Sequence, residues 1–116
     1  MKPISMVHFQ YGSAAVAAEA EPMLREVAEV MKAHPEITLV AVEGHADINE
    51  GKRSTGDISR RRAEAVRDRL VAKGVEPGRL VVVAHGSTKP LDSNATVAGR
   101  AHNRRVQFRV EEKKDP

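Results

Sequence analysis

The most informative stretch of this chain is ITLVAVEGHAD, residues 37–47. Its first part, Ile37 to Val42, is rich in apolar and β-branched residues, which is typical of a strand buried on both faces. The segment from Gly44 to Gly56 that follows is polar and contains glycines, which predicts a loop. Ligands of α/β sheets gather beyond the carboxyl ends of the strands. Asp47, which opens this loop, is therefore the first candidate for a functional residue.

A helix is expected on either side of this strand. Before it, apolar residues recur at the spacing of one helix face between Ala17 and Ala33, and the pair His34-Pro35 ends that helix. After it, a second helix is expected from Asp57 to Ala72, closed by a lysine and a glycine. Further strands are predicted at residues 6–9, 80–83 (buried) and 105–110, a short helix at 95–101, and a frayed tail at 111–116. In the last strand, alternation places Val106, Phe108 and Val110 inward and Arg105 outward.

The resulting order, β-α-β-α-β-(α)-β, predicts an α+β fold, an α/β sandwich in which a mixed sheet of about four strands packs against helices on one face. Strands joined by a helix should be parallel, because such crossovers are right-handed. The 116 residues of the chain suit one domain. We therefore expect a single domain over residues 1–116, with its core at about residues 7–110.

The composition excludes several kinds of site and leaves one question open. The chain has no cysteine, which rules out disulfides, thiolate zinc sites and cysteine nucleophiles. Its net charge of +3 is unevenly divided: residues 1–50 hold three Lys/Arg and eight Asp/Glu, and residues 51–116 hold sixteen and eight. A basic second half fits an anionic partner, such as nucleic acid, acidic lipid or a carboxylate-rich polymer, and fits a solvated basic face equally well.

Arg62 is the second candidate, because it lies on the inward-leaning side of its helix. It is four residues from both Ile58 and Val66, which are apolar. A buried charge needs a partner, and Asp47 is the nearest plausible acid along the chain. Two interpretations remain open. The pair is either an ion pair that pins the loop to the helix, or a receptor in which Asp47 takes an ammonium group and Arg62 a carboxylate.

Three motifs carry a resemblance to a known family: Gly44-His45-Ala46-Asp47, Ile58-Ser59-x-x-Arg62-Ala63-x-x-Val66 and Gly99-Arg100-x-x-Asn103-Arg104-Arg105-Val106. In this order they resemble the OmpA-like C-terminal domain, the family of peptidoglycan-associated lipoprotein and of the periplasmic part of MotB. The resemblance covers roughly Val7 to Val110. It implies non-catalytic binding of peptidoglycan through the diaminopimelate of its stem peptide, with Asp47 holding the amino group and Arg62 a carboxylate.

The resemblance also implies a setting and a wider site. Secondary contacts are expected from Gly44, His45, Ala46, Thr55, Ile58 and Arg104. For Arg104, anchoring of the sheet edge remains an alternative to ligand contact. The domain is expected in the periplasm, as part of a larger membrane-associated protein that it anchors to the cell wall. No cofactor is expected, and the oligomeric state is left open.

Other functions find weaker support in the sequence. A nucleic-acid or polyanion binder is the main alternative on charge, but the chain has three aromatic residues for base stacking and no helix-turn-helix pattern, so no nucleic-acid partner is expected. The scattered histidines His45, His85 and His102 lack metal-ligand spacing, so no metal is expected, and His45 is interpreted as a packing or hydrogen-bonding residue. Serines 59, 87 and 93 lie in no nucleophile elbow, so no hydrolase is expected.

Overall fold

The computed structural model describes residues 6–51 and 57–115, which form one four-stranded sheet with helices. The strands are β1 (Val7–His8), β2 (Ile37–Gly44), β3 (Leu80–Ala84) and β4 (Arg105–Lys113), and their order in the sheet is β1-β4-β2-β3. Strands β2 and β3 are parallel, whereas β4 is antiparallel to both of its neighbours. The predicted mixed sheet is confirmed, as is the parallel pairing of β2 and β3. The expectation that a helix joins parallel strands is wrong for β3 and β4, which run in opposite directions although a short helix lies between them.

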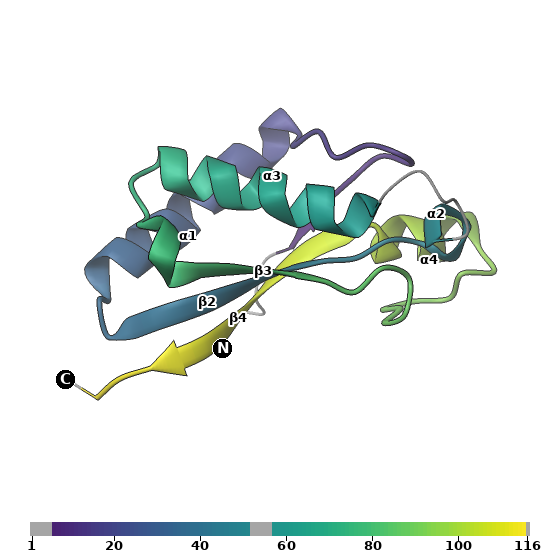
Figure 1. Cartoon of the computed structure of the whole chain (residues 1–116). Helices are drawn as coiled ribbons and strands as arrows, with labels where there is room; N and C mark the ends of the chain where they lie inside the picture. The colour runs from purple at the N-terminus through teal and green to yellow at the C-terminus, as the bar shows by residue number, and fades with distance from the viewer. Residues whose placement is uncertain (1–5, 52–56, 116) are drawn as a thin grey trace.

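Two long helices, α1 (Glu21–Ala33) and α3 (Ile58–Ala72), cover one face of this sheet (Figure 1). The α3 helix begins at Ile58 because the side chain of Asp57 accepts a hydrogen bond from the backbone N–H of Arg60. The chain leaves the helix through Gly74, whose φ of 103° is costly for other residues. Shorter elements complete the fold: the 3₁₀ turns η1 (Ala18–Ala20) and η2 (Pro77–Arg79), and the helices α2 (Ile48–Gly51) and α4 (Val97–Asn103).

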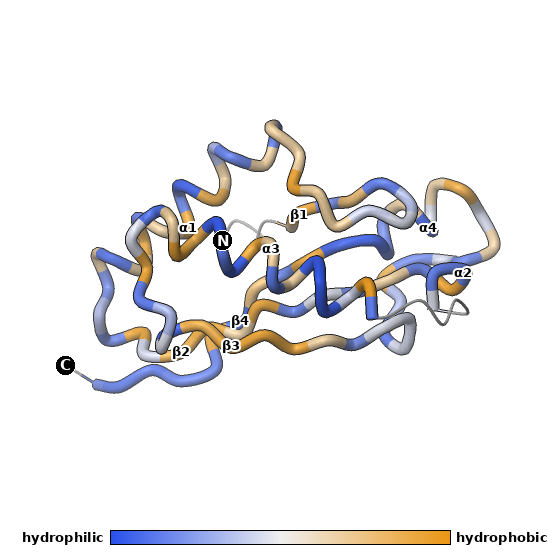
Figure 2. Tube along the Cα trace, turned by 45° about the horizontal axis from the view of Figure 1, so that its top comes forward, coloured by the Kyte–Doolittle hydropathy of each residue, from blue (hydrophilic) through white to orange (hydrophobic). Residues whose placement is uncertain are grey.

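The core is aliphatic and lies between the sheet and the two long helices. Figure 2 shows apolar residues concentrated along β2 and β3, with hydrophilic and apolar residues alternating along α1. The helix residues expected to face inward are buried: Leu24, Ala28 and Met31 of α1, and Ile58, Ala63, Val66 and Leu70 of α3. Burial of these faces supplies the main driving force for folding.

The structure corrects several predictions at the margins of the sheet. Strand β3 lies at a sheet edge, so it is only partly buried. The alternation predicted for β4 is right for Val106 and Phe108 but wrong for Val110, which is 52% exposed where charged residues follow it. Residues 111–113, expected to fray, continue β4. Arg105 is buried, because its guanidinium donates to the carbonyls of Lys89 and Asn103.

The segment after β2 also differs from the predicted loop. Strand β2 extends to Gly44, and residues 48–51 form the helix α2, which lies with α4 at the end of the sheet (Figure 1). Thr55 lies outside the described residues. Among the helices that the structure describes, none is long and apolar enough to span a bilayer.

Candidate functional site

Asp47 and Glu50 form a reciprocal cap at the start of α2. The Oδ1 atom of Asp47 accepts a hydrogen bond from the backbone N–H of Glu50 at 2.8 Å, and Oε1 of Glu50 accepts one from the N–H of Asp47 at 3.0 Å. This is a capping box, the arrangement that satisfies unpaired donors at a helix N-terminus. The box holds both carboxylates at the carboxyl end of β2, within the body of the protein.

Arg62 reaches this cap from α3 and is fully buried. Its Nη1 and Nη2 atoms donate to the two carboxylate oxygens of Glu50 at 2.8 and 2.5 Å. The remaining donors go to the backbone carbonyls of Ser13, His45 and Gln10, at 2.9, 3.1 and 3.1 Å. A guanidinium has five N–H donors, so every donor of Arg62 is used. The predicted inward orientation of this residue is confirmed.

The acid beside Arg62 is Glu50, and the prediction that it is Asp47 is wrong. Asp47 is instead paired with Arg104, whose Nη1 lies 3.0 Å from Oδ2. The sequence distance along the loop was misleading because α2 turns the chain and brings Glu50 back over Arg62. Asp47 and Arg62 both have 0% exposure, so neither side chain is open to solvent in the part of the chain that the structure describes.

These four residues form one electrically balanced cluster of two carboxylates and two guanidinium groups, in which Arg104 is partly exposed and the other three are buried. Glu50 links it to the N-terminal segment, because its Oε2 also accepts a hydrogen bond from the N–H of Gly12 at 2.7 Å. Phe9 lies under the guanidinium carbon of Arg62, 5.2 Å from the ring centre. Chemically, the guanidinium of Arg62 can bind a carboxylate through two parallel hydrogen bonds, and in this structure the carboxylate of Glu50 occupies that position.

Arg104 connects the cluster to an open groove. Its Nε atom donates to the carbonyl of Phe9 at 3.0 Å, so it anchors the sheet edge as the sequence suggested. Arg104 also lines a groove of about 630 Å³ together with residues of β1, the segment before α1 and α4. Among the described residues, Asp47 and Arg62 do not line this groove. Of the four residues Asp47, Glu50, Arg62 and Arg104, only Arg104 lines this groove.

The other predicted contacts are chiefly structural. An added Cβ on Gly44 would lie 1.8 Å from the carbonyl oxygen of Ser59, so this glycine allows β2 to approach α3 closely. The N–H of Ala46 donates to the carbonyl of Gly86 at 2.8 Å. Ser59 holds the same turn by accepting a bond from the N–H of Gly86 at 2.9 Å. Ile58 is buried in the first turn of α3.

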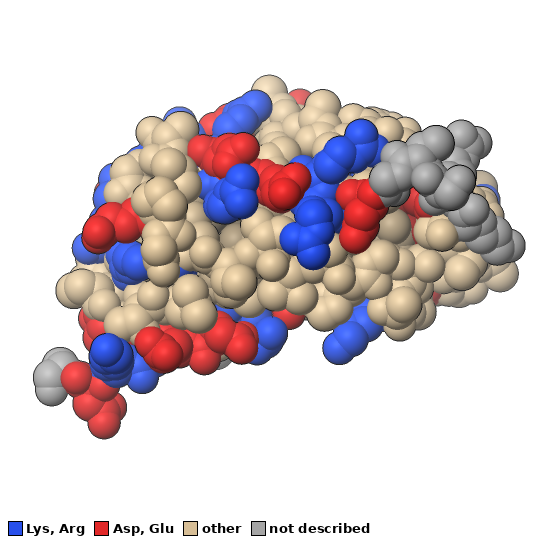
Figure 3. Space-filling view, in the orientation of Figure 1, with Lys and Arg blue, Asp and Glu red and all other residues tan. Residues whose placement is uncertain are grey.

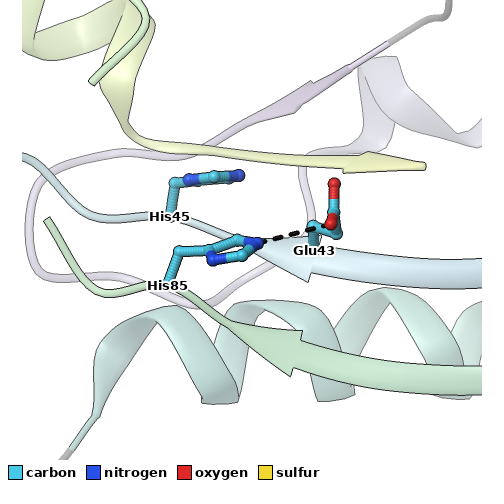
Figure 4. Close-up of side chains that lie close together, drawn as sticks. All are labelled: Glu43, His45 and His85. Carbon is cyan, nitrogen blue, oxygen red and sulfur yellow. Dashed lines mark hydrogen bonds and ion pairs between the residues drawn. The ribbon is translucent and has the colours of Figure 1, made fainter. Parts of the chain in front are cut away.

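His45 and His85 meet at the ends of β2 and β3, together with Glu43 (Figure 4). The two rings stack with their centres 4.8 Å apart, and Nε2 of His85 lies 3.3 Å from Oε2 of Glu43. Neither ring nitrogen of His45 has a hydrogen-bond partner among the described residues. The packing interpretation of His45 is thus supported, and the hydrogen-bonding one is not. His102 lies elsewhere, paired with Asp92.

Burial and neighbouring charges shift the pKa values of His45 and Glu43. Burial, together with the positive charge of Arg105, lowers the pKa of His45 to about 4, so its ring is neutral at pH 7. Burial alone would raise the pKa of Glu43, but hydrogen bonds from His85 and Arg109 more than offset it and lower that pKa below its usual value. The trio therefore combines a neutral imidazole with a carboxylate that stays ionised.

Sequence reasoning missed Glu43 and Glu50. Glu50 had a signal, because an acid followed three residues later by glutamate is typical of a capping box. The signal for Glu43 was weaker: it lies near the carboxyl end of a predicted strand, and parallel strands bring their carboxyl ends to the same edge of a sheet. The surface itself carries mixed charge: over α3, acidic side chains lie among the basic ones on the face seen in Figure 3.

Comparison with known proteins identifies similar chains. A family model described as the OmpA family matches residues 8–104. The chain is 41% identical over 106 residues to outer membrane porin F of Pseudomonas aeruginosa and 38% identical over 99 residues to the peptidoglycan-binding protein ArfA of Mycobacterium tuberculosis. These alignments cover 90% and 85% of the chain, but only 30% of each relative. The peptidoglycan-associated lipoprotein of Burkholderia pseudomallei has a similar structure, with a TM-score of 0.78, 29% identity, and coverage of 89% of this chain and 86% of its own.

Proposed function

Because this chain belongs to the OmpA family, we propose that it is a non-catalytic domain that binds peptidoglycan and anchors a larger protein of the cell envelope to the cell wall. The observation that carries the proposal is the match along most of the chain to relatives named for this binding, ArfA and the peptidoglycan-associated lipoprotein. The proposed location is the periplasm, where an envelope protein can reach the wall. Residues 1–116 are proposed to act as a single domain of that larger protein.

The proposed ligand group is the diaminopimelate of the stem peptide, with Arg62 binding a carboxylate and Asp47 the amino group. Arg62 supports this assignment by its geometry, since it already holds a carboxylate through two parallel hydrogen bonds. In the proposed complex the ligand carboxylate replaces that of Glu50 on Arg62. Because one carboxylate replaces another, the buried guanidinium of Arg62 keeps an anionic partner throughout. Rim contacts are proposed for Gly44, His45, Ala46, Thr55, Ile58 and Arg104.

Affinity for a single stem peptide is expected to be modest. Each charge-assisted contact contributes roughly 1.5–3 kcal/mol, and the release of Glu50 and the loss of freedom on association oppose them. A polymeric wall offers many copies of the peptide, and a membrane-held protein stays close to it. Avidity therefore raises the effective binding strength of the anchored protein above that of one site.

Co-sedimentation with purified sacculi tests this function. Asp47→Asn and Arg62→Lys keep side-chain size or charge but remove a carboxylate or the two-pronged fork. We expect each to weaken binding at least about tenfold relative to the parent, whereas Arg61→Lys, an exposed neighbour on the same helix, should bind like the parent. Circular dichroism at the assay temperature must show that each variant is folded.

The other outcomes separate the alternatives. Equal pelleting of all four proteins would contradict the assignment of Asp47 and Arg62, and failure of the parent to pellet would contradict the function. A fall in binding by orders of magnitude between roughly 50 and 200 mM salt would indicate a polyanion binder instead. A drop in the turbidity of the sacculi would indicate hydrolysis and contradict a purely binding role.

A further inference from the structure

We propose that Glu43, His45 and His85 form a binding site for a divalent transition-metal ion of the zinc class. Each of the three side chains offers one ligand atom, and these atoms all lie within 4.8 Å of one another. Tetrahedral zinc with bonds of about 2.0–2.1 Å needs ligand atoms roughly 3.3 Å apart. The Glu43–His85 pair is already at 3.3 Å, so small side-chain rotations of His45 complete the set. The side chains of this site are not those of the cluster around Arg62, which contacts His45 through its backbone carbonyl.

The strongest evidence is the state of His45. His45 is only 2% exposed, yet neither of its ring nitrogens has a hydrogen-bond partner among the described residues. Burying a polar group without a partner is unfavourable, so such groups are rare in native proteins. A metal ion on one ring nitrogen gives that nitrogen a partner and so removes part of this cost. Imidazole nitrogen is the commonest metal ligand in proteins.

The fold brings the three ligands together from two neighbouring strands. Strands β2 and β3 are parallel with Glu43 opposite Val83 and Gly44 opposite Ala84. His85 continues that register, and its N–H donates to the carbonyl of Gly44 at 3.0 Å. Figure 4 shows Glu43 on β2 beside His85, with the ring of His45 over that of His85. The ligand positions are thus fixed by the rigid ends of the sheet.

Nearby positive charges limit the affinity and leave a route of entry. Arg109 holds Oε2 of Glu43 at 3.1 Å, but it is half-exposed and also pairs with Glu111, so it can give up Glu43 without losing its only acid. Arg105 stays close to His45 and opposes an added cation. His85, with 17% of its side chain exposed, opens the site to solvent. We therefore expect weaker binding than at a fully anionic structural zinc site.

The choice of metal follows from the ligand types. Two imidazoles and one carboxylate suit zinc and its neighbours in the transition series, whereas calcium and magnesium prefer oxygen ligands alone. Three protein ligands leave a fourth position for water or for a group from another molecule.

Calorimetric titration of the metal-free, tag-free chain with ZnCl₂ at pH 7.5 tests the proposal, with CoCl₂ as a spectroscopic probe of coordination. We expect one equivalent of zinc to bind the parent. His85→Ala and Glu43→Gln should each weaken binding at least about tenfold, as the loss of a ligand requires. The control His102→Ala removes an exposed histidine outside the trio and should leave binding unchanged.

Imidazole nitrogen NMR of the parent supplies a measurement that does not depend on any variant. Zinc should shift the ring nitrogens of His45 and His85 together and leave those of His102 in place. Absence of zinc binding by the parent, equal affinity in His85→Ala and the parent, or shifts confined to exposed histidines would each overturn the proposal. MgCl₂ added in place of zinc should produce no shift, and an equal response to magnesium would contradict the assigned ligand chemistry.

Discussion

Replacing Arg62 by alanine is expected to lower the free energy of unfolding by roughly 3–5 kcal/mol. The substitution removes five hydrogen bonds and leaves the carboxylate of Glu50 buried beside no cation. It also frees the carbonyls of three chain segments that Arg62 ties together, at Gln10, Ser13 and His45. Because small domains have only about 5–15 kcal/mol of stability, the variant should unfold at much lower urea concentrations.

The neighbouring residue supplies the control for this experiment. Arg61→Ala removes an exposed side chain on the same helix and should change stability by less than about 0.5 kcal/mol. The double variant Arg62→Met, Glu50→Gln removes both charges at once and should recover part of the loss, since an uncompensated buried charge is what costs most. Equal urea midpoints for Arg62→Ala and Arg61→Ala would show that the buried pair does not hold the fold.

Gly44→Ala is expected to cost about 3 kcal/mol or more, although it adds a single methyl group. The new Cβ would lie 1.8 Å from the carbonyl oxygen of Ser59 and 2.8 Å from its carbonyl carbon, both of which are backbone atoms. No side-chain rotation can relieve this overlap, so β2 and the first turn of α3 must separate. The separation would also strain the bond between Ser59 and the N–H of Gly86.

Gly78→Ala is the matched control, because nothing lies within 4 Å of a Cβ built at that position. Thermal or urea unfolding should place this variant within about 0.5 kcal/mol of the parent. If Gly44→Ala is as stable as Gly78→Ala, the close packing of strand and helix is not what Gly44 is for. In that case a role of Gly44 at the rim of the ligand site would become its main explanation.

The elements of the fold were largely predictable because their signals are local. The apolar run from Ile37, the helix periodicity of α1 and α3, and the glycine at position 74 each report on their own neighbours in the chain. The prediction failed where the environment comes from distant residues. Arg105 was expected to face solvent because of strand alternation, yet the loop that carries Lys89 folds over it and provides an acceptor.

The sequence singled out Asp47, Arg62 and Arg104, but it indicated neither their partners nor the part played by Glu50. Spacing on α3 placed Arg62 inward, as the structure confirms. Its partner depends on α2, a four-residue helix within the segment predicted to be a loop, which brings Glu50 to the guanidinium. Arg104, which is 57 residues from Asp47 in the sequence, could be paired with it only through the assembled sheet. Ion pairs of this kind depend on the topology of the sheet, which cannot be inferred from residue spacing within one segment.

The histidines show the same division between local and long-range information. Three histidines without regular spacing gave no metal signal in the sequence. Parallel pairing of β2 and β3 then placed His85 beside His45, because both follow the ends of aligned strands. The proximity of these two histidines therefore becomes evident only from the register of the two strands.

The central claim is that Arg62 exchanges the carboxylate of Glu50 for one from a diaminopimelate stem peptide. Calorimetric titration of the parent with two peptides tests it most directly: a stem peptide that ends in diaminopimelate, and the same peptide with the diaminopimelate carboxylates converted to amides. We expect the first to bind and the second to bind at least about tenfold more weakly, as the loss of one charge-assisted bidentate contact requires. Equal affinities for the two peptides, or no binding of the first, would contradict the account.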